Sequence, residues 1–320
     1  MVEPIRQSIP RDLFPQDPKW LATLRENAWT RAEHLTYPTG REEAWRYTDV
    51  ARLHDDRFPA RLSVAGLPEA AHPRWENLAD ATPAAAALSD GAPAEIRLEP
   101  GLARQGVRLL SLHRAAREEP DLLQGHLGRL VGSDDVFTAR SLALHRGGLL
   151  LYVPAGVQVE GPVRWLHWLA AAGSAVDTRS VVILETGASL SLEERFESDD
   201  LALPTRVQPV LEIFVGQGAS LRYQQWQTWG AGTHHLGQVR ARLARDARIT
   251  TLLAGFGADF ARTEHRVTLA GEGAEAKLLG AYFPNGEQHH ELWTVQDHQA
   301  PHTASDLLYK GALGGAGRAL

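Results

Sequence analysis

A short pattern recurs four times in the second half of the chain, and it constrains the fold more than any other feature. Each copy is a β-type run, a Gly-Ala or Asp-Ala pair, and a second run with alternating apolar positions. The four alanines are Ala188, Ala219, Ala247 and Ala274, so successive copies are 31, 28 and 27 residues apart. Self-similarity at a period of about 20–50 residues is typical of repeat architectures. We therefore expect one structural unit to be stacked several times.

The Gly-Ala and Asp-Ala pairs suit tight corners between strands. Gly or Asp tolerates a backbone with positive φ, and the alanine after it is small enough to sit inside a bend. Strand–corner–strand units of this length suit the coils of a β-helix, stacked about 4.8 Å apart. An antiparallel sandwich or barrel also gives many short strands with turn signals, and it stays open as the competing fold. In a β-helix, Leu190, Leu221 and Ile249 should face the interior.

The chain is expected to be mainly β, with a change of character near residue 136. Residues 136–320 carry the repeats and are predicted to form a right-handed parallel β-helix. Residues 1–135 are predicted to be α-rich, because apolar side chains recur at three- and four-residue spacing after Pro18. Within that region, residues 79–95 (ADATPAAAALSDGAPAE) are rich in Ala, Pro and Asp. This composition predicts a flexible connector.

Composition excludes several classes of protein. Hydrophobic residues make up 43% of the 320, which is enough for a sizeable core. The 33 Lys and Arg against 39 Asp and Glu argue against a dedicated nucleic-acid binder. The sequence shows neither an apolar run long enough to span a bilayer nor a signal peptide, so we expect no membrane contact and a cytoplasmic location. Cysteine is absent, which excludes thiolate metal sites, Cys-ligated clusters and Cys nucleophiles for this chain alone.

A histidine-rich segment is the most conspicuous constellation of candidate ligands. It contains His289, His290, His298 and His302, with glutamates nearby. Histidine and glutamate bind iron or zinc well, so a metal-handling surface is one reading. However, adjacent residues of a strand point to opposite faces, so His289 and His290 could not both bind one ion without a bend. We prefer a structural role, with these four histidines as weak metal candidates and no catalytic residue assigned.

Three other groups are read as structural. The pair His234-His235 follows a Gly-rich stretch and is expected in a solvated turn. The acidic run of residues 193–200 could supply paired carboxylates for glycoside hydrolysis, but an exposed acidic loop is the preferred reading. Trp226 and Trp229 could bind a sugar, yet packing against the coil wall is preferred.

Several segments resemble the SufB/SufD family, in the order in which that family has them. Residues 43–49 (EAWRYTD) resemble its N-terminal E-x-W-(K/R)-Y-T-D signature, and residues 153–163 (VPAGVQVEGPV) resemble the start of its β-helix. Residues 269–282 and 298–311 resemble its late coils. The matching residues are Glu43, Trp45, Tyr47, Thr48, Asp49, Pro154, Gly156, Pro162, Gly273, Ala274, His298, Pro301, Ser305 and Lys310.

This resemblance implies a non-enzymatic scaffold subunit of iron–sulfur cluster assembly. The absence of cysteine points to the SufD branch, because SufB subunits typically carry cysteines. The implied partners are a SufB-type subunit, in a heterodimer of β-helices, and the SufC ATPase. The chain alone is expected to bind no cofactor, although the full complex would assemble a cluster transiently. The alternative function is a β-fold metal-dependent or sugar-active enzyme that uses the region of His289, His290 and His298.

The resemblance also implies a departure at the C-terminal end. Family members continue past the segment that matches Lys310, complete the β-helix and add a C-terminal helical domain that docks SufC. Relative to that pattern, we expect the β-helix to be incomplete at its C-terminal end and the helical domain to be absent. The contact with SufC is therefore not expected to form.

Overall fold

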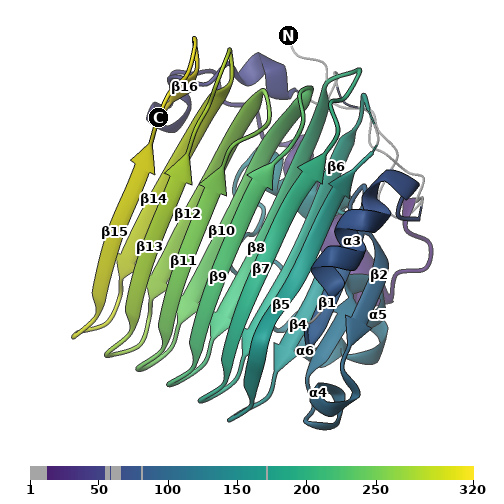
Figure 1. Ribbon diagram of the computed structural model, residues 1–320, viewed down its shortest axis with the longest axis vertical. Coiled ribbons are helices and arrows are strands. Elements are labelled where there is room, and N and C mark those ends of the chain that lie inside the picture. The colour runs from purple at the N-terminus through teal and green to yellow at the C-terminus, as the bar shows by residue number, and fades with distance from the viewer. Residues whose placement is uncertain (1–12, 55–57, 59–65, 81, 171) are drawn as a thin grey trace.

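Two parallel sheets, stacked face to face, make up most of the molecule. The computed structural model describes residues 13–54, 58, 66–80, 82–170 and 172–320. From β4 (Leu149–Val153) onwards, successive strands alternate between the two eight-stranded sheets, and each pairs in parallel with the strand two positions away in the sequence. This arrangement is a β-helix, or β-solenoid, of about six turns (Figure 1). The fold class predicted from the repeats is confirmed, and the parallel pairing decides against an antiparallel sandwich.

We name the two sheets A and B. Sheet B contains, in spatial order, β2 (Ala92–Leu98), β1 (Ala84–Ser89), β5 (Gln158–Leu169), β7 (Ser189–Ser198), β9 (Ser220–Thr228), β11 (Arg248–Gly255), β13 (Glu275–Tyr282) and β15 (Ala304–Gly311). Sheet A contains, in spatial order, β3 (Arg108–Ser111), β4 (Leu149–Val153), β6 (Ala175–Leu184), β8 (Thr205–Val215), β10 (Thr233–Leu243), β12 (Phe260–Leu269), β14 (His289–His298) and β16 (Arg318–Ala319). The pairs β1–β2 and β3–β4 at the N-terminal end are antiparallel.

The repeated corners have the conformation that their residues predict. The backbone φ is +68° at Gly187, +64° at Gly218, +54° at Asp246 and +71° at Gly273. The alanine after each of these residues is buried. Because L side chains rarely adopt positive φ, glycine and aspartate at these four positions set where each coil turns.

An aliphatic ladder fills the interior between the sheets. Leu221 lies opposite Leu190 on one side and Ile249 on the other, and all three are buried as predicted. The same register on sheet A places Ile213 beside Val182 in the same core. Each such side chain stabilises the fold by roughly 1.5–3 kcal/mol when it is fully buried. The central part of each coil is therefore held by stacked apolar side chains.

The prediction of a flexible connector at residues 79–95 was wrong. Residues 84–98 form the antiparallel hairpin β1–β2, and β1 also pairs in parallel with β5. Asp90 and Gly91 both have positive φ, +46° and +83°, which is the geometry of a tight two-residue hairpin turn. Ala84 to Ala87 are all buried. Ala85 and Ala87 pack against helix α3 (His72–Ala79), whereas Ala84 and Ala86 face the interior core.

The N-terminal region contains helices and extended segments that pack on the outside of the β-helix. Its helices besides α3 are α2 (Lys19–Glu33), α4 (Pro100–Arg104), α5 (Leu112–Glu118) and α6 (Pro120–Gln124), with short turns η1 (Glu43–Trp45), η2 (Val50–Leu53) and η4 (Glu69–Ala71). Leu21 of α2 and Leu123 of α6 pack with Val181 of β6 in one apolar cluster. Helices α2, α5 and α6 therefore cover part of the outer face of sheet A, whereas α3 packs on β1 and β5 of sheet B.

The change of secondary structure is less sharp than the division at residue 136 suggests. Helix α7 (Val136–Leu144) occupies the first nine residues of the half that was expected to be β, and a capping box of Asp135 and Thr138 starts it. Strands β1 to β3 come from the half that was expected to be α-rich. The division into two domains at this point stays a prediction. Within the described residues, we find no helix with the length and apolarity needed to cross a membrane.

Candidate functional site

The family-like motif of residues 43–49 is anchored to the outer face of sheet A by a buried polar cluster. Thr48 donates its hydroxyl hydrogen to the Glu291 carboxylate, with Oγ1 2.7 and 2.9 Å from the two oxygens. Arg262 donates from Nη1 to Glu291 Oε2 at 2.6 Å and to the carbonyl oxygen of Ala44 at 2.8 Å. The Arg262 guanidinium also lies 4.1 Å from the ring centre of Trp45. We call Thr48, Arg262 and Glu291 the motif anchor.

The other family-like positions of this motif have weaker contacts. Tyr47 is 63% exposed, and Glu43 is exposed as well. Asp49 forms an ion pair with Arg52 at 3.0 Å, and both side chains are more than half exposed. Of the five motif residues, Trp45 and Thr48 therefore contact the β-helix, and the sequence alone does not show that their partners lie in β12 and β14.

A second buried charge pair joins the N-terminal region to sheet A. Arg179 of β6 lies 3.5 Å from Glu212 of β8, and both side chains are fully buried. Glu212 accepts hydrogen bonds from the backbone N–H groups of Gly128 and Leu130, each at 2.7 Å, and of Val131 at 3.1 Å. Burial lowers the pKa of Arg179 to about 10 and raises the pKa of Glu212, because both charged forms lose hydration.

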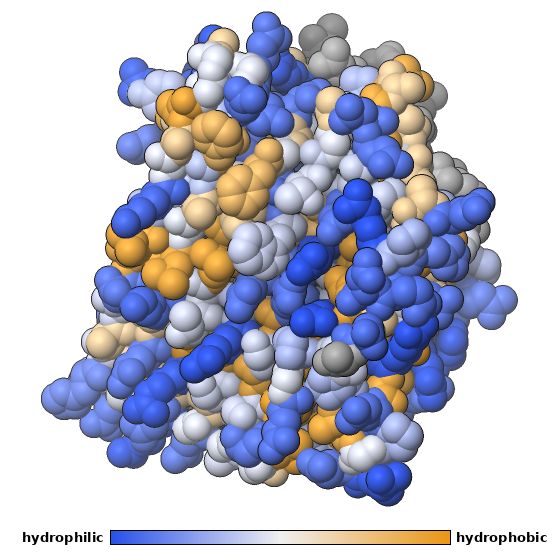
Figure 2. Space-filling model, viewed as in Figure 1, coloured by the Kyte–Doolittle hydropathy of each residue, from blue (hydrophilic) through white to orange (hydrophobic). Residues whose placement is uncertain are grey.

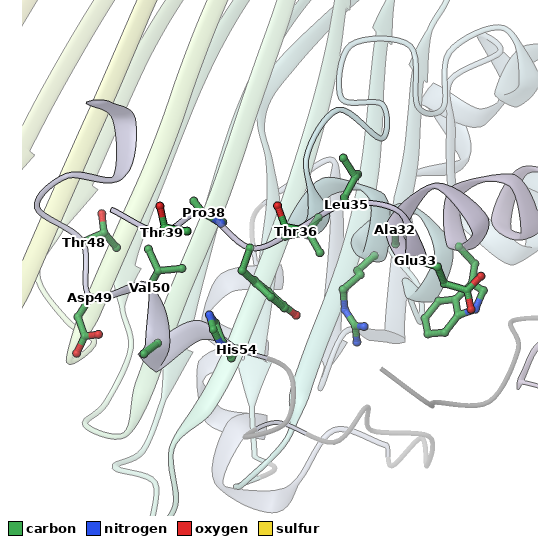
Figure 3. Close-up of a pocket in the computed structure, with 15 residues that line it drawn as sticks. Ala32, Glu33, Leu35, Thr36, Pro38, Thr39, Thr48, Asp49, Val50 and His54 are labelled. Carbon is green, nitrogen blue, oxygen red and sulfur yellow. The ribbon is translucent and has the colours of Figure 1, made fainter. Parts of the chain in front are cut away.

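A pocket lies beside the motif anchor, between the motif and the N-terminal helix α2 (Figure 3). It has a volume of about 780 Å³, in the range of small-molecule sites. The C-terminal end of α2, the extended residues 35–39, the end of the motif and helix α7 line it. In Figure 3, Thr48, Asp49 and Val50 come from the motif side, and Ala32 and Glu33 come from α2. Its walls combine apolar side chains with few charged groups.

The four candidate metal ligands do not converge. His289 faces outwards, with Nε2 3.5 Å from Glu291 Oε1, whereas His290 faces the interior and donates from Nε2 to the Gly257 carbonyl oxygen at 2.9 Å. The two ring nitrogens of His298 lie 2.7 Å from Thr303 Oγ1 and 3.0 Å from Ser305 Oγ. In the part of the chain that the structure describes, no group of three or more His, Cys, Asp or Glu side chains could hold a metal ion.

The remaining family-like residues lie at corners and in the late coils. Gly156 has a φ of +74° and donates its N–H to the carbonyl oxygen of Thr186, one coil away. Pro162 pairs with Ser191 where β5 resumes its register after an irregularity. His302 occupies the turn before β15 with a φ of +56°, next to Pro301. Lys310 is exposed near the end of β15. These positions shape coils, and the structure does not bring them together as one site.

Residues 193–198 of the predicted exposed acidic loop instead belong to strand β7, and Glu194 is buried, whereas Asp199 and Asp200 follow the strand and are exposed as predicted. Glu194 faces the interior, where His167 Nε2 lies 2.6 Å from its Oε1. Tyr223 Oη lies 2.5 Å from Glu194 Oε2 and 3.0 Å from Gln225 Oε1. We call His167, Glu194, Tyr223 and Gln225 the interior polar chain. The alternation of Leu190, Leu192, Glu194 and Phe196 along β7 is the signal that could have identified it.

The predicted solvated turn at His234-His235 was also wrong, because both residues belong to β10 and are buried. Trp229 donates from Nε1 to His235 Nδ1 at 3.1 Å, so Nε2 of the neutral ring carries the hydrogen. Trp229 is itself buried against Phe196, with ring centres 5.5 Å apart, which agrees with the packing role predicted for it.

Buried histidines should make the fold sensitive to acid. Burial lowers the pKa of His265 to about 3, whereas an unfolded histidine has a pKa of about 6.5. The unfolded chain therefore takes up the proton first, and stability is lost as the pH falls from about 6.5 towards 3. His265 has no hydrogen-bond partner for either ring nitrogen among the described residues. Between pH 7.5 and pH 5, we expect the free energy of unfolding to fall by about 2 kcal/mol less in His265→Leu than in the parent chain.

Urea unfolding at the two pH values measures this difference. The matched control is His72→Leu, at a position that is exposed in the fold, and it should keep the pH dependence of the parent chain. An equal loss of stability in the His265→Leu variant and the parent would contradict the prediction.

Comparisons with known proteins agree with the fold and the motifs. Residues 11–165 match the SufBD protein N-terminal region, and residues 167–320 match the SufBD core domain of the SUF system for FeS cluster assembly. The chain is 25% identical to the Bacillus subtilis iron–sulfur cluster assembly protein SufD over 314 residues, which cover 93% of this chain and 69% of SufD. It is 25% identical to SufB of the same organism over 210 residues, or 65% of this chain and 45% of SufB.

A SufBD family protein of Staphylococcus epidermidis is 23% identical over 224 residues, or 70% of this chain and 48% of that protein. The chain thus spans about half the length of several curated relatives that it matches. The two matched regions nevertheless account for almost all of the chain, and their boundary falls within the first coil, at the end of β5. The chain belongs to the SufBD family of iron–sulfur cluster assembly proteins.

Proposed function

We propose that this chain is a SufD-type, non-catalytic scaffold subunit of iron–sulfur cluster assembly, with a SufB-type subunit and a SufC-type ATPase as its partners. The similarity to SufD over 93% of the chain, against 65% for SufB, supports the SufD assignment. The absence of cysteine supports a subunit that does not itself hold a cluster through thiolates. A cytoplasmic location belongs to the same proposal.

The observation that carries the proposal is that these polar side chains of the β-helix bond to other parts of the same molecule. Arg179, Glu212, Arg262 and Glu291 bind the N-terminal region to sheet A. His290 and His298 are bonded to neighbouring backbone or hydroxyl groups. These contacts support a structural use of the charged and histidine side chains, which is consistent with a scaffold.

The outer face of sheet B offers a surface for a protein partner. Leu252, Leu279 and Leu308 lie in one register row across β11, β13 and β15, and Leu308 is 49% exposed. Figure 2 shows apolar residues gathered on this part of the face. Exposed apolar patches of this kind mark interaction surfaces. This patch supports a role that depends on association with other proteins.

Anaerobic reconstitution and co-purification test the proposal. We expect the purified chain, incubated with iron and sulfide, to develop no stoichiometric charge-transfer absorption, because it offers no thiolate ligands. We also expect it to co-purify with a SufB-type subunit from the same organism. Cluster absorption that is lost in a His298→Ala variant, but kept in a His72→Ala control, would contradict the non-catalytic role. Failure to bind the SufB-type subunit would contradict the partner assignment.

A binding assay with the SufC-type ATPase tests whether residues 1–320 contain a docking surface for it. The family resemblance places the SufC contact in a C-terminal helical domain, so the residues described for this chain should not capture the ATPase alone. Capture by this chain would place a docking surface within residues 1–320.

A further inference from the structure

A cavity of about 20 Å³ lies inside the β-helix, between β9 and β11 of sheet B and β12 and β14 of sheet A. Its buried polar lining comprises Gln225, Gln227, Thr263 and His290, which are all at least nine-tenths buried. Both ends of the Gln227 amide are already bonded to the backbone of Gly257. A space of this size holds about one water molecule. Gly255 faces it, and a Cβ atom added there would meet only His290 Nδ1, at 3.8 Å.

His290 presents an unpaired acceptor to this cavity. Its Nε2 lies 2.9 Å from the carbonyl oxygen of Gly257, which can only accept, so Nε2 carries the ring hydrogen. In the neutral ring, Nδ1 then carries a lone pair and no hydrogen, so it can only accept a hydrogen bond. Nδ1 lies towards Gly255, and no donor among the described residues reaches it. A buried acceptor without a donor costs about 1–3 kcal/mol, so a donor is expected nearby.

Gln225 presents unused hydrogen-bonding groups from the other side. Its Oε1 lies 3.0 Å from Tyr223 Oη, and Tyr223 also lies 2.5 Å from Glu194. This contact with Tyr223 is the one hydrogen bond of the Gln225 amide among the residues that the structure describes. Gln225 also lines a neighbouring cavity beside Glu194, so it borders both that cavity and the one beside His290.

We propose that this cavity binds one internal water molecule, which bridges Gln225 and His290. The water bonds to the Gln225 amide and donates a hydrogen to His290 Nδ1, and the hydroxyl of Thr263 is its third partner. Three partners are typical of a buried water. The bridge extends the interior polar chain across β11 to β14, so that one hydrogen-bonded path crosses the coils from β5 to β14. It is a hydration site of the interior and does not depend on the proposed function.

The variant Gly255→Ala tests the water directly. The φ of Gly255 lies outside the left-handed region, so alanine fits the backbone. A methyl group there occupies the cavity. If the water is present, its displacement strands the Gln225 amide and His290 Nδ1, and we expect Tm to fall by a few degrees. If the cavity is dry, the methyl group fills a void and Tm rises.

The matched control is Gly101→Ala in α4, where an added Cβ meets nothing within 4 Å. This variant should raise Tm in either case, because it removes the same backbone freedom from the unfolded chain. A high-resolution crystal structure of the parent chain gives the second measurement. We expect one ordered water within hydrogen-bond distance of Gln225 and His290. A dry cavity, or a rise in Tm for Gly255→Ala that equals the control, overturns the proposal.

Discussion

A Leu221→Asp variant is expected to be unfolded or to lose most of its stability, whereas Ser220→Asp should fold like the parent chain. Leu221 is 1% exposed and stacks between Leu190 and Ile249 in successive coils. The substitution removes roughly 1.5–3 kcal/mol of apolar burial and places a charge between two apolar neighbours, which costs several kcal/mol more. Ser220 is exposed on the outer face of sheet B, where a carboxylate stays hydrated.

Circular dichroism and thermal unfolding of the two variants check this prediction. If Leu221→Asp does not fold at all, Leu221→Ala provides the graded measurement, with an expected loss of about 2–5 kcal/mol from burial and cavity formation. Equal Tm values for the variants at positions 220 and 221 would show that Leu221 does not face a stacked interior.

The corners could be predicted from sequence because they depend on local conformation. Glycine or aspartate at positive φ, followed by a small residue, is visible within a few residues of the chain. The period of the corners then places Leu221 and its neighbours in one register. The hairpin β1–β2 was missed for the opposite reason. Alanine has little preference for strands, and the run at residues 84–87 becomes β only because β5 and α3 pack on either side of it.

The buried polar groups could not be recognised so directly, because their partners are far apart in the sequence. Glu212 lies between Leu211 and Ile213, and Arg179 lies in the polar run of residues 177–180, so both read as solvent-facing residues of a half-buried strand. The segment that covers them includes Leu130 and Val131, which are about 50 and 80 residues earlier in the chain. Glu194 lies in an acidic run that reads as exposed. Its burial follows from the strand register, which turns every second side chain inwards.

The motif anchor gives a physical reason for the composition of the family-like segment. Thr48 is short enough to reach Glu291, and its hydroxyl satisfies a carboxylate that is also bonded to Arg262. Trp45 covers the flat face of the Arg262 guanidinium. A buried carboxylate and guanidinium require such partners, because an unpaired charge in the interior is strongly destabilising. The N-terminal segment thus completes the surface of sheet A.

The largest effect on the outer face of sheet A is expected at the pair of Arg179 and Glu212. Arg179→Met should lower the free energy of unfolding by about 3–5 kcal/mol, because it leaves a buried carboxylate without its cation. Glu212→Met should cost a similar amount, since it leaves the Arg179 guanidinium uncompensated and strands the backbone N–H groups of residues 128–131.

The double variant distinguishes a coupled pair from two independent losses. Arg179→Met with Glu212→Met removes both charges, so the total loss should be smaller than the sum of the single losses by at least about 1 kcal/mol. Urea unfolding of the parent chain, the two single variants and the double variant gives the coupling free energy between positions 179 and 212. The exposed pair of Arg114 and Glu118, 2.8 Å apart, is the matched control, and Arg114→Met should unfold at the same urea concentration as the parent. Additive losses at positions 179 and 212 would mean that the two buried charges do not stabilise each other.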